Sequence, residues 1–218
     1  MKITQIIAWL TFLIGLFFRM NRLPGAFFIM AFGTLLLLIH CIVFSTKTTK
    51  ENISTLFLHI SFTIWTIYLL LKISFISCGP MIFGFSLLFI IAFYISIIYF
   101  IQHFIKSKQI KTPQILFIAY FIFSVWFSFI HSDRVYYVIN LNTITQIENR
   151  NENFWNWDTY SWFLYLANKQ NEAIQANLKA QQIIEEKIKK TNDEELLLQL
   201  NYIKKHNQYI RERSWVND

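Results

Sequence analysis

The sequence has little charge, glycine, proline or cysteine. Charged residues make up 15% of the 218 residues, whereas about 25% is typical of soluble proteins. There are only 5 Gly, 3 Pro and 2 Cys. Two cysteines exclude a secreted scaffold held together by disulfides. The low charge, together with 55% hydrophobic residues, excludes a disordered chain and argues against an ordinary soluble enzyme.

Acidic side chains are nearly absent from the first 131 residues, where Glu51 is the only one. The same region holds nine Lys and Arg, so the net charge of +7 comes from its loops rather than from a basic domain. Nucleic-acid binding is not expected, because it needs Lys and Arg clustered on one face. A carboxylate-driven pump, transporter or motor is also disfavoured, since ion relays usually need titratable groups inside the membrane.

This acid-poor region does contain long apolar segments rich in aromatics, and the mean hydropathy of the chain is +0.38. A membrane-spanning helix needs about 20 apolar residues, with about 17 as a minimum. We predict five spans, each bounded by charge or by a Pro or Gly break: 3–18, 23–44, 53–71, 81–101 and 114–130. Backbone groups in hydrocarbon must bond to one another, so all five should be helices. The expected fold class is an all-α membrane protein with a five-helix transmembrane bundle over residues 1–131.

The distribution of Lys and Arg predicts the orientation. With five spans, six basic residues fall on the side of the N-terminus and three on the other. We therefore expect a multi-pass protein of the inner membrane, with a cytoplasmic N-terminus and a periplasmic tail. If the short first span does not cross the membrane, the remaining four spans place the N-terminus and the tail on the same side of the membrane. That span lacks a small-residue cleavage site, so we expect it to be retained. Cys41 and Cys78 fall toward opposite membrane surfaces and should not pair.

After Ile130 the composition becomes polar, and Asp133 and Arg134 mark the expected water boundary. Residues 132–153 are predicted to form a linker or interfacial segment. Within it, the Val/Tyr run 135–139 suits either a short strand or an interfacial stretch.

Residues 154–218 are predicted to form a small soluble helical module. Apolar spacings of three and four indicate helices from Asp158, across 173–188 and after Thr191, with a capping box from Thr191 to Glu194. Three helices of about 60 residues are marginal alone, so docking to the membrane or to a partner is expected.

The first two tail helices resemble a single tetratricopeptide-type hairpin. Trp157, Leu164, Ala173 and Ala180 fit its pattern, whereas Asn177 departs from it. Such repeats bury their core by stacking on neighbours, so a generic helical bundle remains open. A true repeat would argue for peptide or protein binding.

An aromatic cluster opens the tail module, and it supplies our candidate partner-binding residues. It forms either an interfacial belt or small core, or a groove for a ligand or peptide. The candidates are Trp155, Trp157, Tyr160 and Trp162.

His40 and His59 are the ionisable residues predicted to lie well inside the membrane, about 7–9 Å below the inner surface at 1.5 Å per residue. Adjacent antiparallel helices would bring them together. They are weak candidates for a bis-His haem or metal site. The alternative is hydrogen bonding to a neighbouring Ser, Thr or carbonyl group. No cofactor or metal is therefore predicted.

Catalytic motifs are missing: the sequence has no P-loop, GxSxG, HExxH or CxxC pattern. An enzyme is therefore disfavoured. It would need convergent groups at the junction of membrane and tail, near His131, Asp133, Trp155 and Asp158.

The turn from Leu16 to Ala26, followed by Gly33, resembles the N-terminal hairpin of the gliding-motility GldL inner-membrane family. The matching residues are Phe18, Arg19, Pro24, Gly25, Ala26 and Gly33. The segment 21–23 departs from the usual His-Trp, and the resemblance covers about residues 1–45. Physically, Pro24 would start a helix, and Gly25 and Ala26 would let the two spans approach closely.

The resemblance implies a GldL-like hairpin of a Bacteroidetes membrane protein, without motor activity. Motor members of that family carry a Glu in the second span for proton-driven motion, whereas this chain continues after Gly33 with Thr34 and four leucines. It also lacks the family's long cytoplasmic extension and has three further predicted spans. Gly15, Gly25 and Gly33 could pack within the hairpin or between copies of the chain.

From these observations we expect a membrane scaffold or assembly protein whose helical tail binds a protein partner or a second copy. The alternative is a transporter or a cofactor-carrying membrane subunit that uses His40 and His59.

Overall fold

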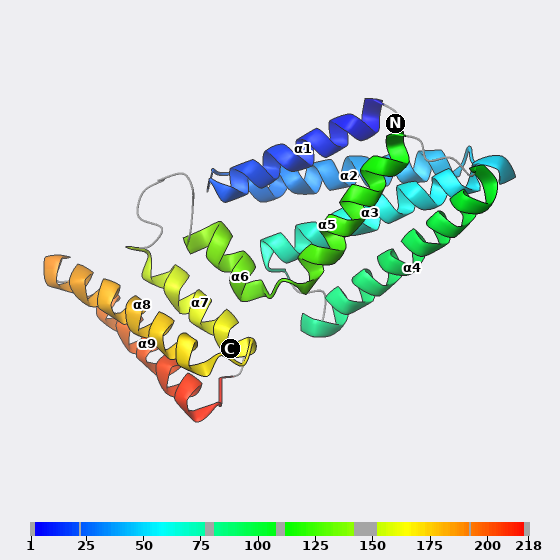
Figure 1. Cartoon of the computed structure of the whole chain (residues 1–218). Helices are drawn as coiled ribbons and strands as arrows, with labels where there is room; N and C mark the ends of the chain where they lie inside the picture. Colours follow the sequence, from blue (N-terminus) through cyan, green and yellow to red (C-terminus); the bar gives the residue numbers. More distant parts are fainter. Residues whose placement is uncertain are drawn as a thin grey trace. The chain divides into compact units, whose positions relative to one another are not determined.

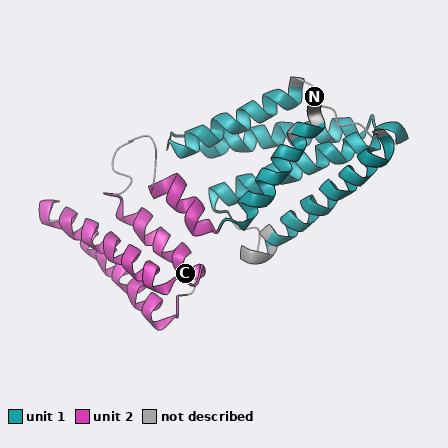
Figure 2. Ribbon diagram, viewed as in Figure 1, with its two compact units in different colours: residues 1–130 teal, residues 131–218 magenta. Residues whose placement is uncertain are grey.

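The computed structural model describes residues 3–21, 23–76, 81–107, 112–141, 152–191 and 193–215. Within these ranges all regular structure is helical, which confirms the all-α class. The chain divides into two compact units, residues 1–130 and 131–218, which have different colours in Figure 2.

The first unit consists of five helices labelled in Figure 1. They are α1 (Ile3–Met20), α2 (Ala26–Ser45), α3 (Ile53–Ser74, after the 3-10 turn η1, Lys50–Asn52), α4 (Met81–Ser107) and α5 (Thr112–Phe129). Three stretches are long and apolar enough to cross a membrane: Ala26–Ser45, Lys50–Ser74 and Ser86–Lys106. Thr4–Met20 and Phe117–Phe129 are shorter apolar helices. The chain therefore has the character of a membrane protein.

Two glycines allow α1 and α2 to pack backbone to backbone along the hairpin in Figure 1. A Cβ atom on Gly33 would lie 2.7 Å from the Phe12 nitrogen and 2.9 Å from the Ala8 oxygen. A Cβ on Gly15 would lie 2.6 Å from the Met30 nitrogen. The sequence left open whether these glycines pack within the hairpin or between copies of the chain. In the structure, Gly15 and Gly33 both pack within the hairpin.

The turn between α1 and α2 uses Pro24 and Gly25 differently from our prediction. Gly25 has φ 79° and ψ 0°, the values of position i+2 in a type II turn, where proline is favoured at i+1. Pro24 thus lies in the turn and does not start the helix, which begins at Ala26. The Gly25 carbonyl accepts the first helical hydrogen bond, from the Ile29 amide (3.0 Å).

Aromatic side chains form the interior of the first unit. Trp9 on α1 meets Phe62 on α3 and Tyr120 on α5, with ring centroids 5.7 and 4.5 Å away. Trp65 is fully buried, and its indole nitrogen donates to Ser96 Oγ on α4 (3.1 Å). α3 is therefore the central helix of the three long apolar ones, and its buried fraction is the largest.

Lys72 lies near the end of α3 with its ammonium group buried. Its Nζ donates to the carbonyl oxygens of Phe127 (2.8 Å) and Ser128 (2.9 Å) in the last turn of α5. A cation at this position binds carbonyls of the last helical turn and complements the helix dipole. We counted Lys72 as a loop charge, but the structure places it inside α3, where it joins α3 to α5.

We expect Lys72→Met to lower the free energy of unfolding by about 1–3 kcal/mol, because two carbonyls lose a charged donor. Thermal unfolding of the purified protein in detergent measures this loss. Lys106→Met is the matched control. Lys106 Nζ also donates to two carbonyls, those of Lys50 and Glu51, but at an exposed site. An equal loss in both variants would contradict a special role for Lys72.

The second unit contains α6 (Ser132–Tyr136), the π-helical turn η2 (Tyr137–Leu141), α7 (Phe154–Leu166), α8 (Gln170–Thr191) and α9 (Glu194–Glu212). The 135–139 run is helical, so the strand alternative is wrong. The rest of the predicted linker, 142–151, lies outside the described residues. Asp133 is 1% exposed and pairs with Lys169 (3.0 Å).

The connection between α7 and α8 is a Schellman turn. Asn168 has φ 58°, the left-handed conformation that asparagine tolerates. The amides of Lys169 and Asn168 donate to the carbonyls of Leu164 and Tyr165, both at 2.9 Å.

Two helix starts differ from our predictions. α7 begins four residues before Asp158, at Phe154, because the Asn153 side chain accepts from the Trp155 amide (3.0 Å). The cap of α9 is Asp193 rather than Thr191, which ends α8. In each case the side chain directly before the helix satisfies an amide two residues on.

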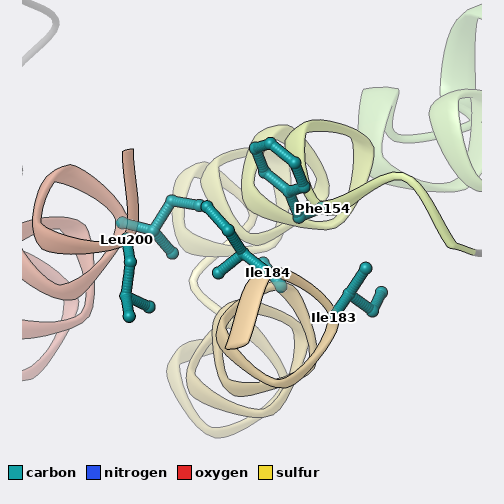
Figure 3. Close-up of a cluster of buried hydrophobic side chains, with 6 residues drawn as sticks. Phe154, Ile183, Ile184 and Leu200 are labelled. Atoms are coloured by element: carbon teal, nitrogen blue, oxygen red, sulfur yellow. The ribbon is translucent and has the colours of Figure 1, made fainter. Parts of the chain in front are cut away.

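The helices α7, α8 and α9 share a hydrophobic core, seen in Figure 3. It consists of Phe154, Ala180, Ile183, Ile184, Leu200 and Ile203. Ala173 and Ala180 are fully buried, so α7 and α8 do form a tight hairpin. Membership of the tetratricopeptide class stays a prediction.

Candidate functional site

The structure brings together the two predicted membrane histidines. The ring centroids of His40 on α2 and His59 on α3 lie 5.0 Å apart, edge to face. Helix α1 supplies a polar partner to each: Thr4 Oγ1 lies 3.0 Å from His40 Nδ1, and Gln5 Nε2 donates to His59 Nδ1 (2.9 Å). Sequence reasoning missed both partners, which lie side by side in the first turn of α1.

These contacts determine what the histidine pair can do. With Gln5 Nε2 facing it, His59 Nδ1 is engaged by a side-chain amide of α1 and is directed into the protein. The rings touch each other directly, which suits a hydrogen-bonded polar cluster between helices. Among the described residues, no group of three or more His, Cys, Asp or Glu is arranged to hold a metal ion.

A buried polar network joins the three long helices of the second unit. Asp158 on α7 accepts from His206 Nδ1 on α9 (2.7 Å) and from Asn177 Nδ2 on α8 (2.8 Å). The Asn177 oxygen accepts from Asn207 Nδ2 (3.1 Å), and the Asn207 oxygen accepts from Arg211 Nε (2.7 Å). Asp158, Asn177, His206 and Asn207 are each at most 8% exposed. A single hydrogen-bonded path therefore runs from a buried carboxylate to a guanidinium group.

The sequence contained traces of this network. Asn177 departs from the repeat pattern, and Asn207 interrupts the apolar stripe of α9. Both asparagines are polar because they form hydrogen bonds of the network. His206 was missed. The Trp215 ring stacks on His206 (centroids 4.3 Å apart), which with Asp158 fixes the imidazole on two sides. We assign the network to holding α7, α8 and α9 in register.

The two carboxylates that an enzyme at the junction of membrane and tail would need have different partners among the described residues. Asp158 is bound to His206, whereas Asp133 is paired with Lys169. His131 precedes α6 at its N-terminus. The carboxylates thus belong to separate structural interactions.

The four candidate partner-binding aromatics occupy three places. Trp155 is half-exposed beside Tyr202 (centroids 6.2 Å apart). The Trp162 ring contacts the Trp215 ring in a tilted arrangement (centroids 4.9 Å apart). Only Trp157 and Tyr160 lie together, because they line the same open groove.

This groove, which we call the α8 groove, has a volume of about 670 Å³. It is lined by Trp157, Tyr160, Leu164, Asn171, Glu172, Ile174, Gln175, Ala176, Leu178, Lys179 and Arg211. Burial, and then the negative charges of Asp133 and Glu172, raise the pKa of Tyr160 to about 12. The phenol therefore stays protonated at neutral pH and presents a hydroxyl to the groove.

The GldL-like motif residues serve the geometry of the α1–α2 hairpin. Pro24 and Gly25 form the exposed turn, while Ala26 and Gly33 are buried between the helices. The Arg19 guanidinium lies 6.0 Å from the centre of the Phe75 ring, at the end of α3.

No protein-family model, curated protein or solved structure matches this chain. Its function has to be argued from the α8 groove and from the histidine pair.

Proposed function

We propose that this chain is a multi-pass inner-membrane scaffold or assembly protein whose helical tail binds a protein partner at the α8 groove. The supporting observation is the groove itself, where Trp157 and Tyr160 stand beside Leu164, Ile174 and Leu178. Aromatic residues in such a setting are typical of protein interfaces and of their energetic centres.

In this proposal α1 and α5 also cross the membrane, giving five spans, a cytoplasmic N-terminus and a periplasmic tail. α1 has 18 residues, about 27 Å at 1.5 Å per residue, close to the hydrocarbon thickness of about 30 Å. Arg19 at its end can extend toward the headgroups. Labelling of single cysteines at Asn153 and Lys108 with a membrane-impermeant maleimide tests this: opposite sidedness is expected.

The α1–α2 hairpin is, in this proposal, a GldL-like anchor without motor activity. The close helix contact at Gly15 and Gly33 supports an anchoring role. No carboxylate is present on α2 to carry a proton.

Deletion of residues 153–218 is expected to abolish co-purification of the partner and to leave membrane insertion intact. The sharper experiment changes Trp157 and Tyr160 to alanine in the full chain. Trp162→Ala is the matched control, because Trp162 does not line the groove. Unchanged co-purification in the Trp157/Tyr160 variant would reject the proposal.

A second candidate is a transporter or cofactor-carrying subunit, favoured by the direct contact of His40 and His59 between apolar helices. His59→Ala tests it in the purified protein. Metal content and Soret absorbance that do not change would eliminate the cofactor-carrying subunit.

A further inference from the structure

The hydrogen-bonded path that starts at Asp158 ends at the α8 groove. Arg211 donates through Nε to Asn207, and its side chain also lines the groove. Asn207 is itself held by the fully buried Asn177. The guanidinium is therefore oriented from inside the unit, whereas an ordinary surface arginine would have to lose much side-chain entropy on binding a ligand.

The bond to Asn207 uses only Nε of the guanidinium. Its two terminal amino groups belong to the same planar fork, which matches the geometry of a carboxylate. An arginine oriented in this way is suited to hold a carboxylate, and a lysine at the same place would bind it only as a point charge.

The charge of the groove lining has the same sign as Arg211. Lys179 is a second exposed basic residue in the lining, and Glu172 is the one acidic residue there. Lys169 pairs more closely with Asp133 (3.0 Å) than with Glu172 (3.7 Å), so Glu172 keeps its negative charge. The lining thus offers two basic groups against one carboxylate.

Apart from the polar residues Asn171 and Gln175, the uncharged lining is apolar or aromatic. Trp157, Tyr160 and Leu164 come from α7, and Ile174 and Leu178 come from α8. A ligand that fits both parts carries apolar side chains and negative charge on one segment. A small inorganic anion would leave the aromatic wall uncovered.

We propose that the α8 groove binds an acidic segment of a partner protein, with one carboxylate of that segment held by Arg211 and its apolar side chains against Trp157 and Tyr160. This inference rests on the proposed function and specifies the chemistry of the partner. Charge complementarity of this kind selects partners and accelerates their encounter.

Binding of two fluorescent probe peptides to the full chain in nanodiscs tests the proposal. Both are twelve residues long and alternate Leu or Phe with a charged residue, Glu in one and Lys in the other. Fluorescence anisotropy should show that the Glu peptide binds at least about tenfold more tightly, as expected for one hydrogen bond to a charged group. Equal affinities, or tighter binding of the Lys peptide, would overturn the proposal.

Variants separate the role of Arg211 from that of overall charge. Arg211→Gln should weaken binding of the Glu peptide about tenfold, and Arg211→Lys should recover only part of this loss. Lys190→Gln on the same helix as Lys179 is the control, because it removes one positive charge outside the groove lining. Equal weakening by Arg211→Gln and Lys190→Gln would show a charge effect only and would reject the assigned site.

Asn207→Ala tests the orientation of Arg211. The variant keeps the guanidinium but removes its internal acceptor, so affinity for the Glu peptide should fall by less than in Arg211→Gln. Circular dichroism reports whether the variant folds. If it does not fold, the two Arg211 substitutions decide the question alone, because they leave the buried part of the network in place.

A bilayer is the other anionic surface near a membrane protein. A bromobimane label on a cysteine at Leu178 should be insensitive to doxyl-labelled lipids in the nanodisc, and strong quenching would reject a protein partner.

Failure of the proposal is distinguishable from failure of the proposed function. If the Glu peptide shows no preference while the Trp157/Tyr160 variant still loses its partner, the groove binds a protein of different chemistry.

Discussion

Asp158→Ala is expected to destabilise the second unit strongly while the membrane helices stay folded. The substitution removes the acceptor of two buried donors, His206 Nδ1 and Asn177 Nδ2. Breaking a buried pair in this way costs about 3–5 kcal/mol. A whole small domain is stable by only about 5–15 kcal/mol, so the loss is a large fraction of that stability and raises the unfolded population of the unit.

Limited proteolysis of the purified full chain, followed with near-ultraviolet circular dichroism, measures this effect. Glu172→Ala is the control, because Glu172 is also an ion-paired carboxylate but is 61% exposed at its side chain. Exposed pairs contribute about 0–1 kcal/mol. A similar protease sensitivity of Asp158→Ala and Glu172→Ala would contradict the structural role of the network.

Gly33→Leu is expected to separate α1 from α2 and to destabilise the first unit by about 3 kcal/mol or more. Overpacking of a core usually costs about 1–3 kcal/mol, and here even the first added atom meets backbone rather than a movable side chain. The clashing atoms are the Phe12 nitrogen and the Ala8 oxygen. Neither can move away without displacing helix α1.

Gly25→Ala provides the contrast within the same hairpin. An added Cβ at Gly25 has nothing within 4 Å, and only the left-handed φ of 79° opposes it. That conformation costs about 1–2 kcal/mol for a residue with a side chain. In thermal unfolding in detergent, the melting temperature of Gly33→Leu should therefore be well below that of Gly25→Ala. The reverse order would refute the close helix contact.

Several local structures followed from short-range chemistry. The break around Asn168 was predictable because asparagine tolerates the left-handed conformation of a Schellman turn. The helix starts were less predictable. Asn153 and Asp193 cap α7 and α9, whereas we predicted that these helices start at Asp158 and Thr191. Several neighbouring residues can cap a helix, and packing decides which of them does.

The polar network shows where a sequence pattern becomes ambiguous. Asn177 and Asn207 lie on apolar helix faces. From the sequence, each could be a polar break in that face or a hydrogen-bond partner of a residue on another helix. Only the approach of α8 to α9 shows that they meet, and that Arg211 is fixed at the groove. Residues 19 to 48 positions apart supply the other bonds of the network, and no local spacing rule relates them.

The sequence by itself determined the class of this protein, its five apolar helical segments and its polar helical tail. These properties depend on composition and on local backbone preference, because hydrocarbon requires helices and charge requires water. The tertiary structure decided which glycines carry the helix contact, which side chains partner the two membrane histidines and where the tail has a groove. Those features depend on side chains from different helices reaching the same place, and the order of residues along one helix does not specify its neighbours.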